Sequence, residues 1–310
     1  MCVRKQPHIE IKNLLDSLSN DLKSGDKHTW ILNNLLRDLK AIERRMKSGE
    51  YADTDFENRN SFDIPRRTRE FFRYFRGYMR QAQTWKVLLK NLPMNSFPSL
   101  INICPGWAPK IELALHLSGY EGQVILFDKN QDSLTSLMDF LEFFEPRFTL
   151  KTVLSDVYSL PKPTAKLVIG NHILDDLLLN KFCQDHNLIL EDVYESESTY
   201  KEIIQKIMTR KLSKEFIAET AQALQAFCEP GATLILTQYP ALAETDLTLT
   251  DWTRFCHDFL LALKAIFLQL GAVDEGTTVL KGLETQTAKY FSAEHAIVLK
   301  TSPYRQQLDL

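Results

Sequence analysis

A strand-helix-strand pattern between Ser99 and Leu137 constrains the fold of this chain more than any other feature. A short apolar run, 100–104, passes through Pro105-Gly106 into apolar residues at helical spacing, and a second apolar run ends at Asp128. In doubly wound sheets the carboxyl ends of such strands border a ligand crevice, where an acid about 20 residues after the first turn is well placed for ribose hydroxyls. The unit therefore predicts a nucleotide-binding α/β sheet with Asp128 in its crevice.

Further apolar runs alternate with helical patterns along the rest of the chain. A Glu229-Pro230-Gly231 turn is expected to lead into one of the strands. The alternation predicts an α/β fold with a doubly wound, mostly parallel seven-stranded sheet covered on both faces by helices. The further strands are expected at 149–154, 166–170, 232–237, 273–282 and 295–300, and the helices at 131–144, 214–228 and 250–270.

The length of 310 residues favours a core domain with an appended segment, because a single core becomes strained above about 250 residues. We predict an N-terminal helical segment over 1–95, which closes over the crevice and supplies substrate contacts. An α/β domain is predicted over 96–310, with a helical insertion at about 180–213. This insertion is interpreted as a lid or substrate wall, and a plain solvated insertion remains an open alternative.

The charge and the cysteine content disfavour three classes of protein: strongly basic nucleic-acid-binding proteins, proteins with a cysteine zinc site and proteins with a disulfide framework. The net charge of −3 gives no global attraction to nucleic acid, and the five cysteines form no C-x-x-C pair. No metal site is expected, because the histidines other than His172 show no metal-ligand spacing in the sequence. There is no apolar stretch long enough to span a bilayer and no apolar signal core, so a cytoplasmic protein is expected.

A basic helix is predicted between Pro65 and Leu92, and its segment 66–90 interleaves arginines with aromatic residues. One interpretation is an RNA-binding surface, because guanidinium groups neutralise phosphates and rings stack on bases. The favoured interpretation places the aromatic residues in the core and the arginines in solvent.

Taken together, the block from Ser99 to Lys300 resembles the class I S-adenosylmethionine-dependent methyltransferases. The motifs that carry the resemblance are INICPG at 101–106, the strand ending at Asp128, LSDV at 154–157, the strand and loop at 167–176, and EPGATLI at 229–235. The resemblance implies S-adenosylmethionine as cofactor and an antiparallel last strand. It also implies cofactor contacts from Cys104, Gly106, Asp128, Lys129, Asp156, Val157 and Asn171.

The chain departs from the family's pattern at two loops. The family carries G-x-G-x-G after the first strand, whereas this chain has one glycine there, so Trp107 and Pro109 are expected to add bulk beside the cofactor. Methyltransferases of nucleobase or glutamine amino groups often have an Asn/Asp-Pro-Pro-aromatic loop after the fourth strand. This chain keeps Asn171 but neither proline, which disfavours methylation of a base.

Candidate catalytic residues follow the fourth strand. His172 is a candidate general base, and Asp175 is a candidate to orient it or to bind a cationic substrate. A purely local role remains open for each of these residues: His172 and Asp175 as helix-starting polar groups, Asp128 as a helix cap and Asp156 as a turn residue.

Three functions remain as hypotheses. The first is methyl transfer to a small-molecule acceptor by direct in-line displacement, which depends mainly on alignment. The second is a catalytically inactive binding or scaffolding protein of the same fold. The third is an RNA methyltransferase that uses the helix at 66–90.

Overall fold

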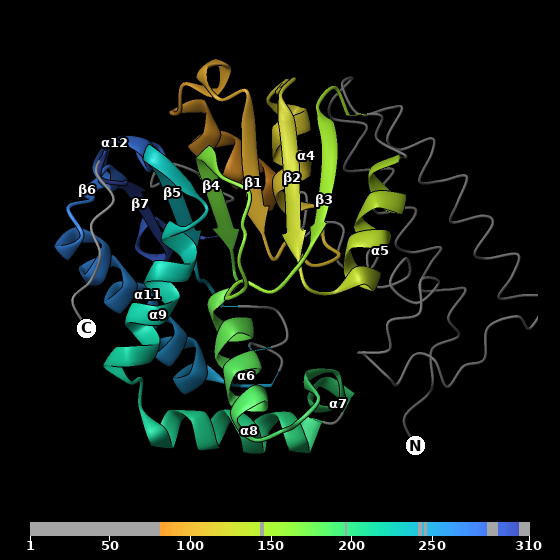
Figure 1. Ribbon diagram of the computed structural model, residues 1–310, viewed down its shortest axis with the longest axis vertical. Coiled ribbons are helices and arrows are strands. Elements are labelled where there is room, and N and C mark those ends of the chain that lie inside the picture. The colour runs from red at the N-terminus through yellow and green to blue at the C-terminus, as the bar shows by residue number, and fades with distance from the viewer. Residues whose placement is uncertain are drawn as a thin grey trace, which may run out of the picture.

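The computed structural model describes residues 81–142, 146–195, 197–240, 244, 247–283 and 291–303. Its centre is a seven-stranded sheet with the order β3-β2-β1-β4-β5-β7-β6 (Figure 1). The pairs among β1 to β5 are parallel, whereas β7 is antiparallel to both β5 and β6. The strands are β1 Ser99–Ile103, β2 Gln123–Asp128, β3 Thr149–Leu154, β4 Ala165–Asn171, β5 Cys228–Thr237, β6 Val273–Asp274 and β7 Ala296–Lys300. The predicted α/β class, strand number and mostly parallel arrangement are confirmed.

Helices cover both faces of the sheet. The helical residues 81–90 pack on one face together with α4, α5 and α12, while α6, α8, α9 and α11 pack on the other. Side chains of β1 and β2 alternate between these two cores, as expected of strands buried on both faces. The helices are α4 Lys110–Leu117, α5 Gln131–Glu142, α6 Leu174–Asp185, α7 Leu190–Glu195, α8 Glu197–Arg210, α9 Lys214–Gln225, α11 Thr250–Gln269 and α12 Gly276–Val279.

The strand register brings several polar residues to one edge of the sheet. Ile103 pairs with Phe127 on one side and with Gly170 on the other, and Asn171 pairs with Thr237. The residues that follow β1, β2, β4 and β5 therefore share the carboxyl edge, and α6 to α8 extend beyond it (Figure 1). This is the edge at which doubly wound folds bind ligands.

Two predicted strand bounds are wrong. The structure has no separate turn at Pro230-Gly231, because β5 already begins at Cys228. The strand bulges there: Cys228 pairs with Ala165 and Thr233 pairs with Leu167, so β5 has extra residues between these two pairs. Gly231 takes a φ of +68°, which allows the bulge without a steric penalty.

The predicted strand at 273–282 is much shorter than expected. β6 ends at Asp274, whose Oδ1 accepts the Gly276 N–H at 2.9 Å and turns the chain into α12. The helices expected at 131–144, 214–228 and 250–270 are present as α5, α9 and α11, although α9 ends earlier, at Gln225. Residues 180–185 of the predicted insertion are the end of α6, and α7 and α8 follow them.

Most of the predicted N-terminal segment, residues 1–80, lies outside the described residues. Its described end belongs to the core of the sheet domain, because Ala82, Trp85, Leu88 and Leu89 are completely buried there. The burial of Trp85 fits the interpretation that places aromatic residues of the basic helix in the core. Within the described part of the chain, no helix is long and apolar enough to cross a membrane.

Candidate active site

The turn after β1 is tightly shaped. Cys104 and Gly106 have positive φ angles of 49° and 62°, and the Gly106 N–H donates to Asp128 Oδ2 at 3.2 Å. A Cβ built on Gly106 would meet no atom of the described residues within 4 Å, so the turn faces open space. Trp107, which was expected to crowd this place, packs against the core on the α4 face. One glycine thus suffices for an open turn.

Asp128 ends β2 and is almost completely buried. Besides the Gly106 N–H, its carboxylate accepts the Asn130 N–H at 2.9 Å. Burial raises the pKa of Asp128, and the backbone N–H donors of Asn130 and Gly106 oppose that rise. A carboxylate has about four acceptor positions, and the Lys129 backbone N–H is a third donor beside those of Asn130 and Gly106, so acceptor capacity remains for a ligand hydroxyl group. The Asn130 bond is also the local contact expected of a turn.

Asp156, Lys129 and Asn180 are connected beside this site. Lys129 Nζ donates to Asn180 Oδ1, and Asn180 Nδ2 donates to Asp156 Oδ2 at 3.5 Å. Asp156 Oδ1 accepts the Tyr158 N–H at 2.8 Å, which is the turn role named as its alternative. Val157 is buried in the core on the α6 face. The carboxyl ends of β2 and β3 are thereby tied to α6.

Asn171 is occupied by protein contacts. Its Oδ1 accepts from Trp85 Nε1 at 3.1 Å, Thr237 Oγ1 at 3.0 Å and Tyr239 Oη at 3.1 Å. The indole N–H can only donate, which fixes the amide orientation. The side-chain oxygen of Asn171 therefore holds the sheet edge together and has no lone pair left for a ligand.

His172 and Asp175 are brought together as predicted. His172 has a φ of +57° directly after β4, and its Nδ1 lies 3.2 Å from Asp175 Oδ1 in the first turn of α6. Gln238 Nε2 also donates to Asp175 Oδ1, at 3.3 Å. The Tyr239 ring flanks the imidazole, with ring centroids 4.9 Å apart. Asp175 thus lies in the first turn of α6 and contacts His172, a position compatible with either role.

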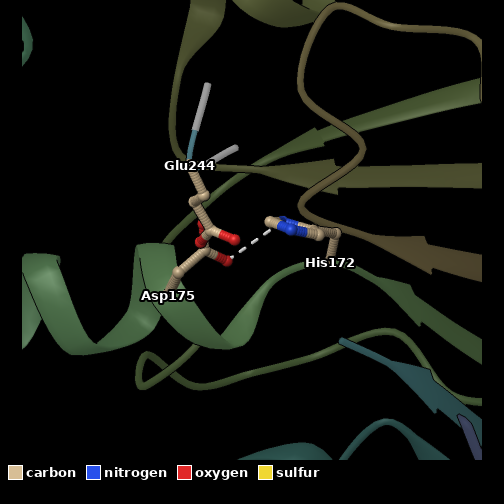
Figure 2. A group of neighbouring side chains, drawn as sticks. All are labelled: His172, Asp175 and Glu244. Atoms are coloured by element: carbon tan, nitrogen blue, oxygen red, sulfur yellow. Dashed lines mark ion pairs between the residues drawn. The ribbon is translucent and has the colours of Figure 1, made fainter. Parts of the chain in front are cut away.

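Glu244 completes this group, and sequence reasoning missed it. One ligand atom from each of His172, Asp175 and Glu244 lies within 4.8 Å of the others, and Figure 2 shows the imidazole ring directed toward both carboxylates. Glu244 follows β5, the neighbour of β4, so the adjacent strand order was the signal that would have pointed to it.

The electrostatics of the group follow from its burial and its charges. Burial lowers the pKa of His172, but the charge and hydrogen bond of Asp175 outweigh it and raise the value to about 9. Burial opposes ionisation of Asp175 as well, and the partnership with His172 nevertheless keeps its pKa below the ordinary value.

The thiol of Cys104 is unsuited to nucleophilic chemistry. Burial raises its pKa well above the ordinary value, and the charges of Asp128 and Asp176 add to the effect. It remains a neutral thiol beside the turn. Cys104, Cys183, Cys228 and Cys256 are free thiols, so the described residues contain no disulfide.

A second pair that sequence reasoning missed lies under the turn. Asn102 of β1 donates from Nδ2 to Glu112 Oε1 of α4 at 2.6 Å, and both side chains are buried. Burial raises the pKa of Glu112 to about 7. A polar residue at an inward position of the first strand, followed by an acid early in the next helix, was the available signal.

No protein-family model and no curated protein matches the sequence. Among solved structures, an O-methyltransferase family protein from Burkholderia thailandensis is similar at 9% identity and a TM-score of 0.42, over 88% of this chain and 71% of that one. Human N-acetylserotonin methyltransferase, solved in complex with SAM, is similar at 11% identity and a TM-score of 0.40, over 76% of this chain.

An S-adenosylmethionine-dependent methyltransferase from Clostridium acetobutylicum is similar at 12% identity and a TM-score of 0.35, over 56% of this chain. The chain spans 59% of the human chain and 58% of the Clostridium chain, less than two thirds of each. The sheet itself identifies the architecture, because it has seven mostly parallel strands, an antiparallel β7 and helices on both faces. The described residues form a Rossmann-like α/β fold, and methyltransferases are among the solved structures that are similar to it.

Proposed function

We propose that this protein transfers a methyl group from S-adenosylmethionine to a small-molecule acceptor. The observation that carries the proposal is the Asp128 carboxylate at the carboxyl edge of β2, bonded to the N–H of the open Gly106 turn. In a doubly wound sheet, such an acid and turn on neighbouring strands are the parts that hold a nucleoside.

The cofactor fits the residues at this edge. Asp128 is proposed to accept the ribose hydroxyls with its remaining lone pairs, and the turn from Cys104 to Gly106 is proposed to border the methionine part. Asp156 and Val157 are proposed to lie on the adenine side, where Lys129 and Asn180 fix Asp156. Asn171 is proposed to shape the site only indirectly, since protein donors occupy its oxygen. When bound, the cofactor supplies an electrophilic methyl group on a sulfonium centre.

His172 and Asp175 are proposed to act on the acceptor. The raised pKa keeps His172 protonated near neutral pH, so the ring must lose the Nε2 proton before it acts as a base. Once the ring is neutral, Asp175 accepts the Nδ1–H, which fixes the tautomer and leaves Nε2 as the proton acceptor. His172 Nε2 is buried and has no hydrogen-bond partner among the described residues, so an acceptor hydroxyl or amine is its natural partner. Alignment of the acceptor with the methyl group supplies much of the rate.

Formation of S-adenosylhomocysteine over a panel of hydroxyl and amine acceptors tests this function. For an acceptor that turns over, His172→Gln and Asp175→Asn are expected to lower the single-turnover rate by about 100-fold or more while the cofactor affinity changes little. His186→Gln, at the end of α6, is the matched control.

Two outcomes would redirect the assignment. Cofactor binding without turnover of any acceptor would favour the catalytically inactive binding protein. Turnover only with RNA would favour the nucleic-acid hypothesis, whose basic residues 66–80 lie outside the described part of the chain.

A further inference from the structure

The group formed by His172, Asp175 and Glu244 has the composition of a cation site. Its three members come from three different segments: the end of β4, the first turn of α6 and the segment between β5 and α11. One nitrogen and two oxygen atoms approach within 4.8 Å of one another (Figure 2). Glu244 is far in sequence from the neighbouring pair His172 and Asp175, so the fold brings it to them.

Each carboxylate is held in place by a neutral donor. Asp175 Oδ1 accepts from Gln238 Nε2 at 3.3 Å, and Glu244 Oε2 accepts from Thr253 Oγ1 at 3.0 Å. Outer contacts of this kind orient the ligands of metal sites. The cluster is therefore preorganised, and its two carboxylates are buried and are not surface acids.

The imidazole supplies the observation that points to a ligand. The His172 side chain is only 8% exposed, and no described residue offers a hydrogen-bond partner to its Nε2. A buried ring nitrogen without a partner is costly, and it is relieved either by a proton acceptor or donor from a ligand or by a metal ion.

The charges favour a divalent ion. Metal binding displaces the proton of His172, which leaves the negative charges of Asp175 and Glu244 in a buried site with Lys110 as a nearby cation. A divalent cation replaces the lost positive charge and balances the two carboxylates. One imidazole with two carboxylates suits first-row transition ions such as Mn²⁺ and Zn²⁺. Three protein ligands leave coordination positions open.

We propose that His172, Asp175 and Glu244 bind a divalent transition-metal ion, and that this ion inhibits methyl transfer by occupying the imidazole lone pair that would accept the acceptor's proton. The binding half stands on the geometry of the cluster alone. The inhibition half rests on the proposed function, because it requires that His172 be the base.

Binding is tested on the full-length, chelator-treated protein without cofactor, with Mn²⁺ followed by electron paramagnetic resonance. Manganese prefers oxygen and nitrogen ligands, so the cysteines compete little. One saturable site is expected, weakened on the order of 100-fold by Glu244→Gln and by Asp175→Asn. Asp176→Asn, which removes an exposed carboxylate next to the cluster, is the matched control and is expected to change the affinity by less than about threefold.

The outcomes separate the two proposals. Absence of saturable Mn²⁺ and Zn²⁺ binding overturns the metal site, whatever the result with S-adenosylmethionine. Binding that Glu244→Gln and Asp175→Asn leave unchanged, while both variants keep the wild-type circular dichroism spectrum, also overturns it. Where turnover is measurable, Zn²⁺ is expected to inhibit the wild type and to inhibit Glu244→Gln much less; equal inhibition of both refutes the inhibitory role.

Discussion

The pair Asn102 and Glu112 lies buried under the Gly106 turn, and the protonation state of Glu112 decides how much this burial costs. Asn102 Oδ1 and Glu112 Oε2 are buried and have no hydrogen-bond partner in the part of the chain that the structure describes. A proton on Glu112 lowers this cost, because the buried carboxyl group is then neutral while Asn102 Nδ2 still donates to Oε1. Burial raises the pKa of Glu112 to about 7, in keeping with a retained proton. The pair joins β1 to α4 on either side of the turn.

This pair makes stability depend on pH in a defined direction. The folded protein binds the Glu112 proton more tightly than the unfolded chain, whose carboxyl has a pKa of 4.5, so stability falls as the pH rises from 4.5 to about 7. The loss amounts to roughly 3 kcal/mol, since each pKa unit corresponds to about 1.4 kcal/mol.

The variant Glu112→Gln is expected to remove this part of the pH dependence, because an amide does not ionise and its oxygen can still accept from Asn102 Nδ2. Urea denaturation at about pH 5 and about pH 8 measures the difference, with the exposed Glu121→Gln as control. The same loss of stability with pH in the wild type and in Glu112→Gln would show that Glu112 does not hold the proton.

Sequence reasoning reached some of these residues and not others. Spacing along one strand-helix-strand unit predicted that Asp128 borders the crevice beside the first turn, and the structure joins it to Gly106 of that turn by a hydrogen bond. Asp175 was found because it follows His172 within one helical turn. Glu244 was not, because only the order of β4 and β5 in the sheet brings it near His172. Sequence patterns predict contacts between residues that are close in the chain. Contacts between distant residues depend on the order of the strands in the sheet.

At the scale of elements, the oxygen of Asn171 joins three segments. It receives hydrogen bonds from Trp85 in the helical residues 81–90, from Thr237 of β5 and from Tyr239 after β5. Gln81 Oε1 also lies 2.9 Å from Tyr239 Oη, so the one hydroxyl proton is shared between Gln81 and Asn171. The helix that precedes β1 is thereby fixed to the carboxyl edge of the sheet, next to His172.

Asn171→Ala is expected to lower the free energy of unfolding by about 3 kcal/mol, because it leaves buried donors without their acceptor. Thr237→Val removes one donor only and is expected to cost about 1 kcal/mol. Urea denaturation compares the two variants. Equal small losses would mean that water replaces the Asn171 oxygen and that the network does not hold the helix.

The elements themselves were predictable to different degrees. The apolar runs of β1, β2 and β4 are buried on both faces, so composition alone marks them. The start of β5 was placed too late, because Pro230-Gly231 signals a turn although the chain continues as a bulged strand. β6 was predicted too long. The hydrogen bond from the Gly276 N–H to the Asp274 side chain ends this strand, and the pattern of apolar residues does not reveal such a bond.

At the scale of the whole molecule, two cores share one sheet. Trp85 lies completely buried in the core with α4, α5 and α12, and Trp252 of α11 lies completely buried in the opposite core. A domain boundary at residue 95 assigns Trp85 to the N-terminal segment, whereas its packing assigns it to the sheet domain. These two assignments of the helical residues 81–90 predict different effects of a Trp85 substitution on stability.

Trp85→Ala is expected to destabilise the sheet domain by about 3–5 kcal/mol, as much as Trp252→Ala on the other face, because each leaves a large cavity in a shared core. Chemical denaturation followed by far-ultraviolet circular dichroism measures both. A Trp85→Ala protein whose main transition is unchanged would assign this helix to a separate N-terminal unit.

The central claim, that the edge at Asp128 and Gly106 holds S-adenosylmethionine, is tested most directly by calorimetric titration of the full-length protein with that cofactor. Saturable binding at one site is predicted, with the Kd raised about 10- to 100-fold by Asp128→Asn, since hydrogen bonds to a charged acceptor contribute about 1.5–3 kcal/mol. Asp132→Asn, an exposed acid in the next helix, is expected to leave the Kd unchanged. Absence of saturable binding to the wild type, or binding that Asp128→Asn does not weaken, would contradict the claim.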